Sequence, residues 1–94
     1  MAILMQVDLA GVGKEQYDKL SARVRSGEIP APGCLAHVAI ATGDGVRVID
    51  LWESQAAMDA FSALLRPAAE ELGFPQSGTP PQVTEVHAYW VPGT

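Results

Sequence analysis

The segment from residue 34 to residue 53 constrains the fold most, because it holds two β-type runs with almost nothing between them. We predict strands at about Cys34–Thr42 and Val46–Glu53, where apolar residues alternate with others. Only Gly43-Asp44-Gly45 lies between them, and such residues favour a primed two-residue turn, which needs a positive φ at its centre. The turn is centred on Gly43-Asp44 or on Asp44-Gly45. Either choice gives an antiparallel hairpin.

A helix is predicted on each side of this hairpin. The first covers about Lys14–Ser26, because Tyr17, Leu20 and Val24 recur at helical spacing and Gly27 follows as a stop.

The second helix begins after Ser54, a natural N-cap, and its apolar residues run from Ala57 to Leu65. Pro67 is expected to bend or restart it, and Gly73 to end it.

Two outer strands complete the chain, at about Ala2–Leu9 and Gln82–Val91. The resulting order is βαββαβ. With right-handed crossovers, it predicts an α+β ferredoxin-like plait: a four-stranded antiparallel sheet with both helices on one face. We expect one domain spanning residues 1–94.

Composition excludes several classes of function. A net charge of −5 disfavours nucleic-acid binding, which needs a basic surface. The apolar runs fall far short of the roughly 18 residues needed to cross a membrane. The N-terminal segment meets Asp8 too early for a signal peptide, and the single Cys34 suits a reducing compartment. We therefore expect a cytoplasmic protein.

The strands sort their side chains into two sets, and the sorting is the same for either turn. We expect the apolar hairpin set to lie under the helices: Val38, Ile40, Ile49 and Leu51. We expect the mixed set on the face away from the helices: Leu35, His37, Ala39, Val48, Asp50 and Trp52. In the first strand Ile3, Met5, Val7 and Leu9 should face the helices, and Leu4, Gln6 and Asp8 should face away. In the last strand Val86, Ala88 and Trp90 should face the helices, and Glu85, His87 and Tyr89 should face away.

The mixed face is too apolar at Trp52, Val48 and Leu35 to remain in water without a cost. We expect a second copy of the sheet to cover it and to enclose a cavity. This predicts a homodimer.

The segment VIDLWESQAAMDAF, residues 48–61, resembles the dimeric α/β-barrel superfamily, and in particular its small antibiotic-biosynthesis-monooxygenase-like proteins. LLRPAAEELG and the terminal VTEVHAYW extend the resemblance over nearly the whole chain. It implies a ferredoxin-like protomer that pairs into an α/β barrel, with small, often aromatic or polyketide-like molecules held between sheet and helices. Some members oxygenate without metal or flavin, some are cyclases or isomerases, and some degrade haem. Haem degradation is disfavoured, because that branch uses an asparagine and a helix-borne histidine, which this chain lacks.

His37 and His87 are the candidate catalytic bases, because histidine titrates near neutrality, and Asp50 is the candidate orienting carboxylate. The candidate ligand-binding residues are Trp52, Tyr89, Glu85 and Gln6. Each has a structural alternative: an imidazole hydrogen-bonded at a sheet interface, or an indole that only packs. Asp8 and Asp50 are expected on neighbouring strands, where two carboxylates would raise one another's pKa. We expect no cofactor, and no metal, because no spacing matches a metal motif.

These features predict a small-molecule-binding homodimer with a cavity between helices and sheet. Whether it is an enzyme stays open. If it is, a cofactor-independent monooxygenase, cyclase or isomerase acting on an aromatic or polyketide-like substrate is expected. The alternative is a non-catalytic ligand-binding or structural dimer module.

Overall fold

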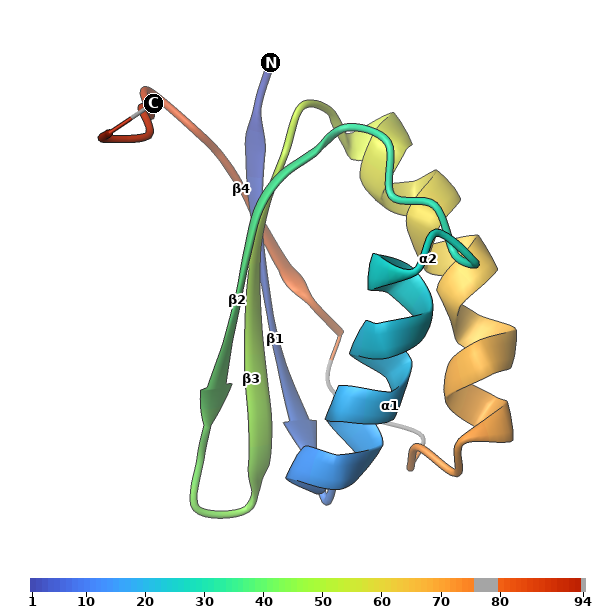
Figure 1. Ribbon diagram of the computed structural model, residues 1–94. Coiled ribbons are helices and arrows are strands. Elements are labelled where there is room, and N and C mark those ends of the chain that lie inside the picture. Colours follow the sequence, from blue (N-terminus) through green and yellow to red (C-terminus); the bar gives the residue numbers. More distant parts are fainter. Residues whose placement is uncertain (76–79, 94) are drawn as a thin grey trace.

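The computed structural model describes residues 1–75 and 80–93, which form one sheet with two helices against it (Figure 1). Neighbouring strands are antiparallel and lie in the order β2-β3-β1-β4. The strands are β1 (Ile3–Ala10), β2 (Cys34–Ala41), β3 (Gly45–Trp52) and β4 (Gln82–Glu85). Both helices, α1 (Lys14–Arg25) and α2 (Gln55–Glu71), cover the same face of the sheet. The predicted ferredoxin-like α+β fold is confirmed.

The β2–β3 hairpin turns at Gly43-Asp44, since the amide of Thr42 donates to the carbonyl of Gly45 at 2.9 Å. Neither central residue has a positive φ, so the predicted primed turn is wrong. Gly45 is needed for another reason. A Cβ at this position would lie 2.1 Å from the carbonyl oxygen of Leu9, so only glycine lets β1 and β3 approach this closely.

The helix ends follow the local signals. Gly27, directly after α1, has φ of 89°, and Gly73, after α2, has φ of 77°. Ser54 caps α2 as predicted, because its side chain accepts a hydrogen bond from the amide of Ala57 at 3.1 Å.

Helix α2 continues through Pro67 without a break, whereas a bend or a restart was expected there. The residue that follows, Ala68, is buried against Leu20 of α1 and Ile29 of the next loop. This packing holds the last part of α2 in the helix, and it offsets the hydrogen bond that proline cannot make.

The buried residues form three clusters between the sheet and the helices. One joins Trp52 to Ile3 and Met58, another contains Val12, Val46 and Val48, and the third contains Leu20, Ile29 and Ala68.

The prediction for which face of the hairpin meets the helices is wrong. His37, Asp50 and Trp52 do share a face, but it is the face under the helices. Trp52 is buried against Met58 of α2, and every second residue of β3 from Val46 to Trp52 is buried. The apolar set that was expected there lies on the open face.

The register of β1 explains the error. Ile3 pairs with Trp52 and Val7 with Val48, so these residues must point to the same side. The prediction that Ile3 and Val7 face the helices is correct, and this places Trp52 there too. Leu35, predicted with the mixed set, falls at an irregularity in the β2 pairing and is exposed.

Strand β4 is shorter than predicted and ends at Glu85 instead of continuing to Val91. Its partner β1 begins at Ile3, which pairs with Glu85, so few residues remain to extend the ladder. The pairing also turns Glu85 to the side of Ile3, which reverses the predicted faces of this strand.

Within the described residues, no helix is both long enough and apolar enough to span a membrane.

Candidate functional site

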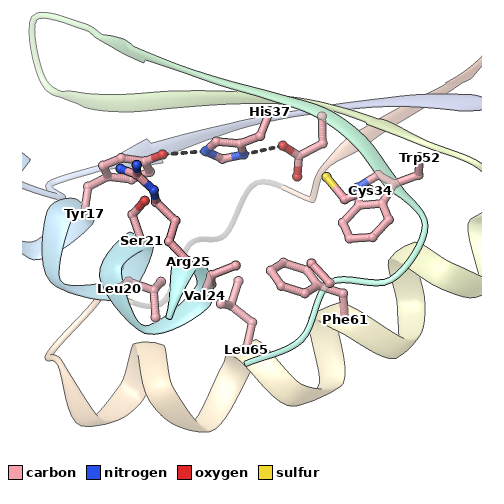
Figure 2. Close-up of a pocket in the computed structure, with 12 residues that line it drawn as sticks. Tyr17, Leu20, Ser21, Val24, Arg25, Cys34, His37, Trp52, Phe61 and Leu65 are labelled. Atoms are coloured by element: carbon pink, nitrogen blue, oxygen red, sulfur yellow. Dashed lines mark hydrogen bonds and ion pairs between the residues drawn. The ribbon is translucent and has the colours of Figure 1, made fainter. Parts of the chain in front are cut away.

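A cavity of about 280 Å³ lies between the helices and the sheet, near the lower end of the range for small-ligand pockets (Figure 2). Its apolar lining is Leu20, Val24, Ala31, Phe61 and Leu65. Its remaining lining residues are Tyr17, Ser21, Arg25, Cys34, His37, Asp50 and Trp52. The expected cavity between sheet and helices is therefore present, and it forms within one protomer instead of between two sheets.

Strand geometry brings the polar groups of the sheet into this cavity. Alternation along β3 puts Asp50 and Trp52 on one face, and His37 of β2 pairs directly with Asp50. The indole of Trp52 packs against Phe61 of α2, with ring centroids 5.2 Å apart and planes tilted by 42°. The cavity therefore has an aromatic wall at the end of β3.

Three side chains in the cavity wall form a series of hydrogen bonds (Figure 2). Nδ1 of His37 lies 2.5 Å from Oδ1 of Asp50, and Nε2 of His37 is hydrogen-bonded to the hydroxyl of Tyr17. The Asp50 side chain is 5% exposed and that of His37 is 43% exposed. When His37 is neutral, Nδ1–H donates to Asp50 and Nε2 accepts from Tyr17. When it is protonated, both nitrogens donate.

The surroundings shift the pKa values of these groups. The hydrogen bond to Asp50 raises the pKa of His37, although burial opposes this. Burial raises the pKa of the Tyr17 hydroxyl, and it raises the pKa of the Cys34 thiol, to which Asp50 adds. Near neutral pH, Tyr17 and Cys34 are therefore uncharged, and His37 is the lining residue suited to accept a proton.

Trp52 carries a hydrogen-bond donor that the described residues leave unused. The residue is 1% exposed, yet its Nε1–H has no hydrogen-bond partner within that part of the chain. A buried unpaired donor costs about 1–3 kcal/mol.

The other predicted site residues lie elsewhere. His87 lies on a bend after β4 and is exposed, as are Tyr89 and Glu85. Gln6 pairs with Ile49 and so lies on the open face of the sheet. Among the lining residues that the structure describes, none of these four is present.

Asp8 and Asp50 lie on neighbouring strands, as expected, but their carboxylates are not neighbours. Asp8 pairs with Arg47 on the open face, where Nε of Arg47 lies 2.6 Å from Oδ1 of Asp8 and lowers the pKa of that carboxyl. Asp50 pairs with Met5 on the helix side. Arg47, the partner of Asp8, lies three positions before Asp50 on β3. Side chains an odd number of positions apart on a strand point to opposite faces, so the two carboxylates do as well.

Sequence reasoning missed the contribution of α1. Tyr17 was counted among the apolar residues at helical spacing, and Arg25 was not among the candidate site residues. A usable signal exists, because Tyr17, Ser21 and Arg25 recur every four residues and therefore share one face of the helix.

The residues that the structure describes contain no group of three or more His, Cys, Asp or Glu side chains able to hold a metal ion.

The fold and the site together define a class of protein. It is a ferredoxin-like α+β protein with an aromatic-walled cavity between the sheet and the helices. No protein-family model matches the sequence, and no curated protein matches it either.

Solved structures with the same fold do exist. A candidate antibiotic biosynthesis monooxygenase of Caulobacter crescentus has a TM-score of 0.57 and 18% identity, with 95% of this chain and 89% of that chain covered. Another from Chloroflexus aurantiacus has a TM-score of 0.55 and 20% identity, with 95% of each chain covered. A monooxygenase of Streptomyces coelicolor in complex with the ligand nanaomycin D has a TM-score of 0.50 and 25% identity, with 96% of this chain and 90% of that chain covered. By fold, the chain groups with the antibiotic-biosynthesis-monooxygenase-like ferredoxin-fold proteins, as the resemblance predicted.

Proposed function

We propose that the protein binds a small aromatic or polyketide-like molecule in the cavity and removes a proton from it without a cofactor. The observation that carries this proposal is the series Tyr17–His37–Asp50 in the wall of a largely apolar cavity. A carboxylate that orients an imidazole and raises its pKa is a common arrangement for a general base. The monooxygenase of Streptomyces coelicolor, solved with nanaomycin D, supports this class of ligand.

The proton follows the hydrogen bonds. Because Tyr17 already occupies Nε2 of His37, the ligand meets the Tyr17 hydroxyl first. The acidic O–H or C–H bond of the ligand breaks, its proton passes to the Tyr17 oxygen, and the former hydroxyl proton of Tyr17 passes to Nε2. His37 becomes an imidazolium ion beside Asp50, and the ligand becomes an anion. That anion can react with molecular oxygen as the oxidant, or it can cyclise or isomerise.

Trp52 holds the ligand in this proposal. Its ring, together with Phe61, packs against the apolar body of the ligand.

The two predicted bases are distinguished by replacing each histidine. Phenols, naphthols and hydroxyquinones are incubated in air without added cofactor, and absorbance, oxygen consumption and product mass are followed. His37→Gln should reduce turnover by about 10²–10⁴-fold, the usual contribution of a general base. His87→Gln removes the imidazole that lies outside the cavity and should retain turnover. Equal turnover in the wild type and in His37→Gln would contradict the proposal.

A non-catalytic ligand-binding role is the second candidate. It is favoured by one observation, namely that both ring nitrogens of His37 already have protein partners. In that case the series is a structural support for the cavity. Ligands should then bind and raise the melting temperature, while no member of the panel is converted.

A homodimer formed through the open face of the sheet is part of the same proposal. This face carries an apolar patch, which we call the β2 patch after its two β2 residues, Val38 and Ile40. The patch also includes Leu4 of β1 and Ile49 and Leu51 of β3. Val38 is 52% exposed, Ile40 is 42% exposed and Leu4 is 37% exposed. A second copy of the same patch would remove this apolar surface from water at roughly 25 cal/mol per Å². Covering this face leaves the cavity, which lies on the other face, intact.

The oligomeric state tests the role of the β2 patch. We expect the wild type to sediment as a dimer, and Val38→Glu to sediment as a monomer with an unchanged circular dichroism spectrum, because a charge in the patch would be buried without a partner. Leu64→Glu is the matched control, since Leu64 is also 52% exposed but lies on α2. A monomeric wild type at micromolar concentration, or a dimeric Val38→Glu, would refute this interface.

A further inference from the structure

We infer that the ligand of the cavity carries an acidic group, a carboxylate or a phenolate, which pairs with Arg25. This inference rests on the proposed function, because it assumes that the cavity holds a small molecule. It goes further by assigning the charge of that molecule and the residue that recognises it.

Arg25 lies at the rim of the cavity. It is exposed to solvent and at the same time lines the cavity, together with Ser21 and Tyr17 from the same face of α1 (Figure 2). Trp52 and Phe61 lie at the other end of the cavity in this view. The polar residues of α1 and the aromatic rings of Trp52 and Phe61 therefore lie at opposite ends of an apolar space in this view.

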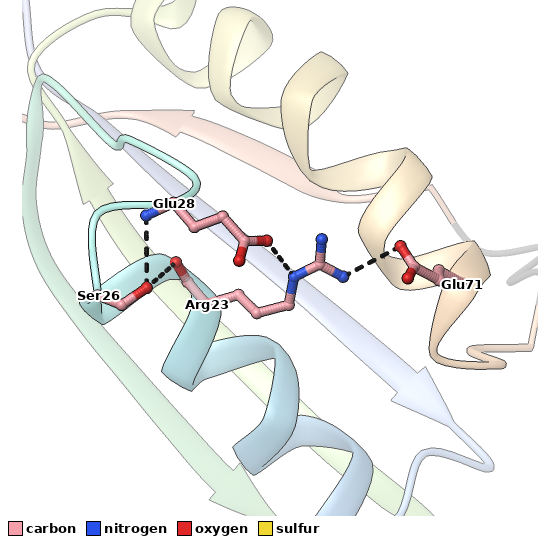
Figure 3. Close-up of polar contacts among 4 residues, drawn as sticks. All are labelled: Arg23, Ser26, Glu28 and Glu71. Carbon is pink, nitrogen blue, oxygen red and sulfur yellow. Dashed lines mark hydrogen bonds and ion pairs between the residues drawn. The ribbon is translucent and has the colours of Figure 1, made fainter.

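No carboxylate of the described residues forms an ion pair with Arg25. The ion pairs found there join Arg23 to Glu28 and to Glu71, His37 to Asp50, and Arg47 to Asp8. Arg23, two residues earlier on α1, lies between its two carboxylates outside the cavity (Figure 3). Among the described residues Lys14, Lys19 and Arg66 also form no ion pair, and Arg25 differs from them because it lines this cavity.

The charges that face the cavity suit an anion. They are Asp50 on β3, His37 on β2 and Arg25 on α1, while burial keeps Tyr17 and Cys34 neutral. With His37 protonated, these groups sum to one positive charge, and with His37 neutral they sum to zero. A monoanion therefore meets no net repulsion in the cavity, although the chain as a whole repels it. The guanidinium fork binds a carboxylate through two parallel hydrogen bonds.

Trp52 is buried and its ring lines the same cavity, beside Phe61. A molecule that fits both ends of the cavity has an acid at the end of Arg25 and aromatic rings at the end of Trp52. The structure thus points to an aromatic acid in place of a neutral aromatic compound.

A plain structural role for Arg25 is the competing explanation. A cation in the last turn of a helix favours the helix dipole by about 0.3–1 kcal/mol. Arg23 lies in the same last turn and has the same charge. It therefore serves as a control: Arg23→Gln removes the same charge from the same turn of the helix, together with the ion pairs to Glu28 and Glu71, but it leaves the cavity untouched.

The test uses the full chain and two probes of equal shape, 2-naphthoate and the neutral 2-naphthamide. Binding is measured by titration calorimetry, and the indole N–H signal of Trp52, assigned with Trp90→Phe, reports whether the cavity is occupied. We expect the wild type and Arg23→Gln to bind 2-naphthoate at least tenfold more tightly than the amide. Arg25→Gln should lose this preference while binding the amide as before, and Arg25→Lys should keep part of it.

The outcomes separate the two proposals. If the amide binds in the cavity but 2-naphthoate has no advantage, or if Arg25→Gln keeps the advantage, the inference about the acid is overturned and the proposed binding function stands. If neither probe moves the Trp52 signal, small aromatic molecules do not bind there, and both proposals are overturned. Melting curves of each variant confirm that it is folded.

Discussion

Asp50→Asn is expected to lower the pKa of His37 and to reduce the proposed turnover by about 10²–10⁴-fold. The carboxylate is almost fully buried, and its hydrogen bond is the largest cause of the raised pKa of the imidazole. An asparagine can still accept a hydrogen bond from Nδ1–H, so the ring keeps its orientation. It cannot stabilise the imidazolium ion by charge. The variant therefore separates the basicity of His37 from its position.

The same variant should change how stability depends on pH. A pKa raised in the folded state contributes stability that is fully present below the unfolded pKa, about 6.5, and is lost as the pH rises through the folded pKa. The melting-temperature difference between the wild type and Asp50→Asn should therefore be larger at pH 5.5 than at pH 8.5. Histidine ring signals followed by NMR, assigned with His87→Gln, give the pKa of His37 directly. An unchanged pKa in Asp50→Asn would show that the carboxylate does not control the imidazole.

Trp52→Ala is expected to have the largest effect on stability. The indole is 1% exposed and joins the end of β3 to α2 through Phe61 and Met58. Removing a fully buried aromatic side chain costs about 3–5 kcal/mol, because the apolar contacts are lost and a void remains. For a chain of 94 residues, each kcal/mol lowers the melting temperature by roughly 4–8 °C. We therefore expect a fall of more than about 10 °C.

Two further variants serve as controls for this result. Trp90→Ala removes an indole that is 78% exposed and should change the free energy of unfolding by less than about 0.5 kcal/mol. Trp52→Phe keeps an aromatic ring but reduces the aromatic wall of the cavity, so it should be far more stable than Trp52→Ala and yet bind 2-naphthoate more weakly. Chemical denaturation and calorimetry measure both effects. A Trp52→Ala protein that melts within a few degrees of the wild type would show that the indole is not a core residue.

The local signals in the chain predicted the elements well. Gly27 and Ser54 mark helix ends through their own backbone and side-chain hydrogen bonding, and these depend on a few neighbouring residues only. The hairpin forms around Gly43-Asp44, one of the two predicted positions, although its turn is not of the primed type. Alternation along a strand is also local, so the grouping of His37 with Asp50 and Trp52 on one face was correct.

Which side of the sheet that face occupies is a tertiary property. Both faces of the hairpin carry apolar residues, so hydrophobicity did not distinguish a face that meets the helices from the exposed β2 patch. The pairing of Ile3 with Trp52 decided the matter, and it joins residues 49 positions apart. The position of Tyr17 and Arg25 at the cavity is also a tertiary property. Their spacing on α1 was visible in the chain, but only the packing of α1 over β2 and β3 brought them to the cavity. Alternation and helical spacing thus follow from the amino-acid sequence, whereas contacts between distant segments depend on register and packing, which no short stretch of sequence contains.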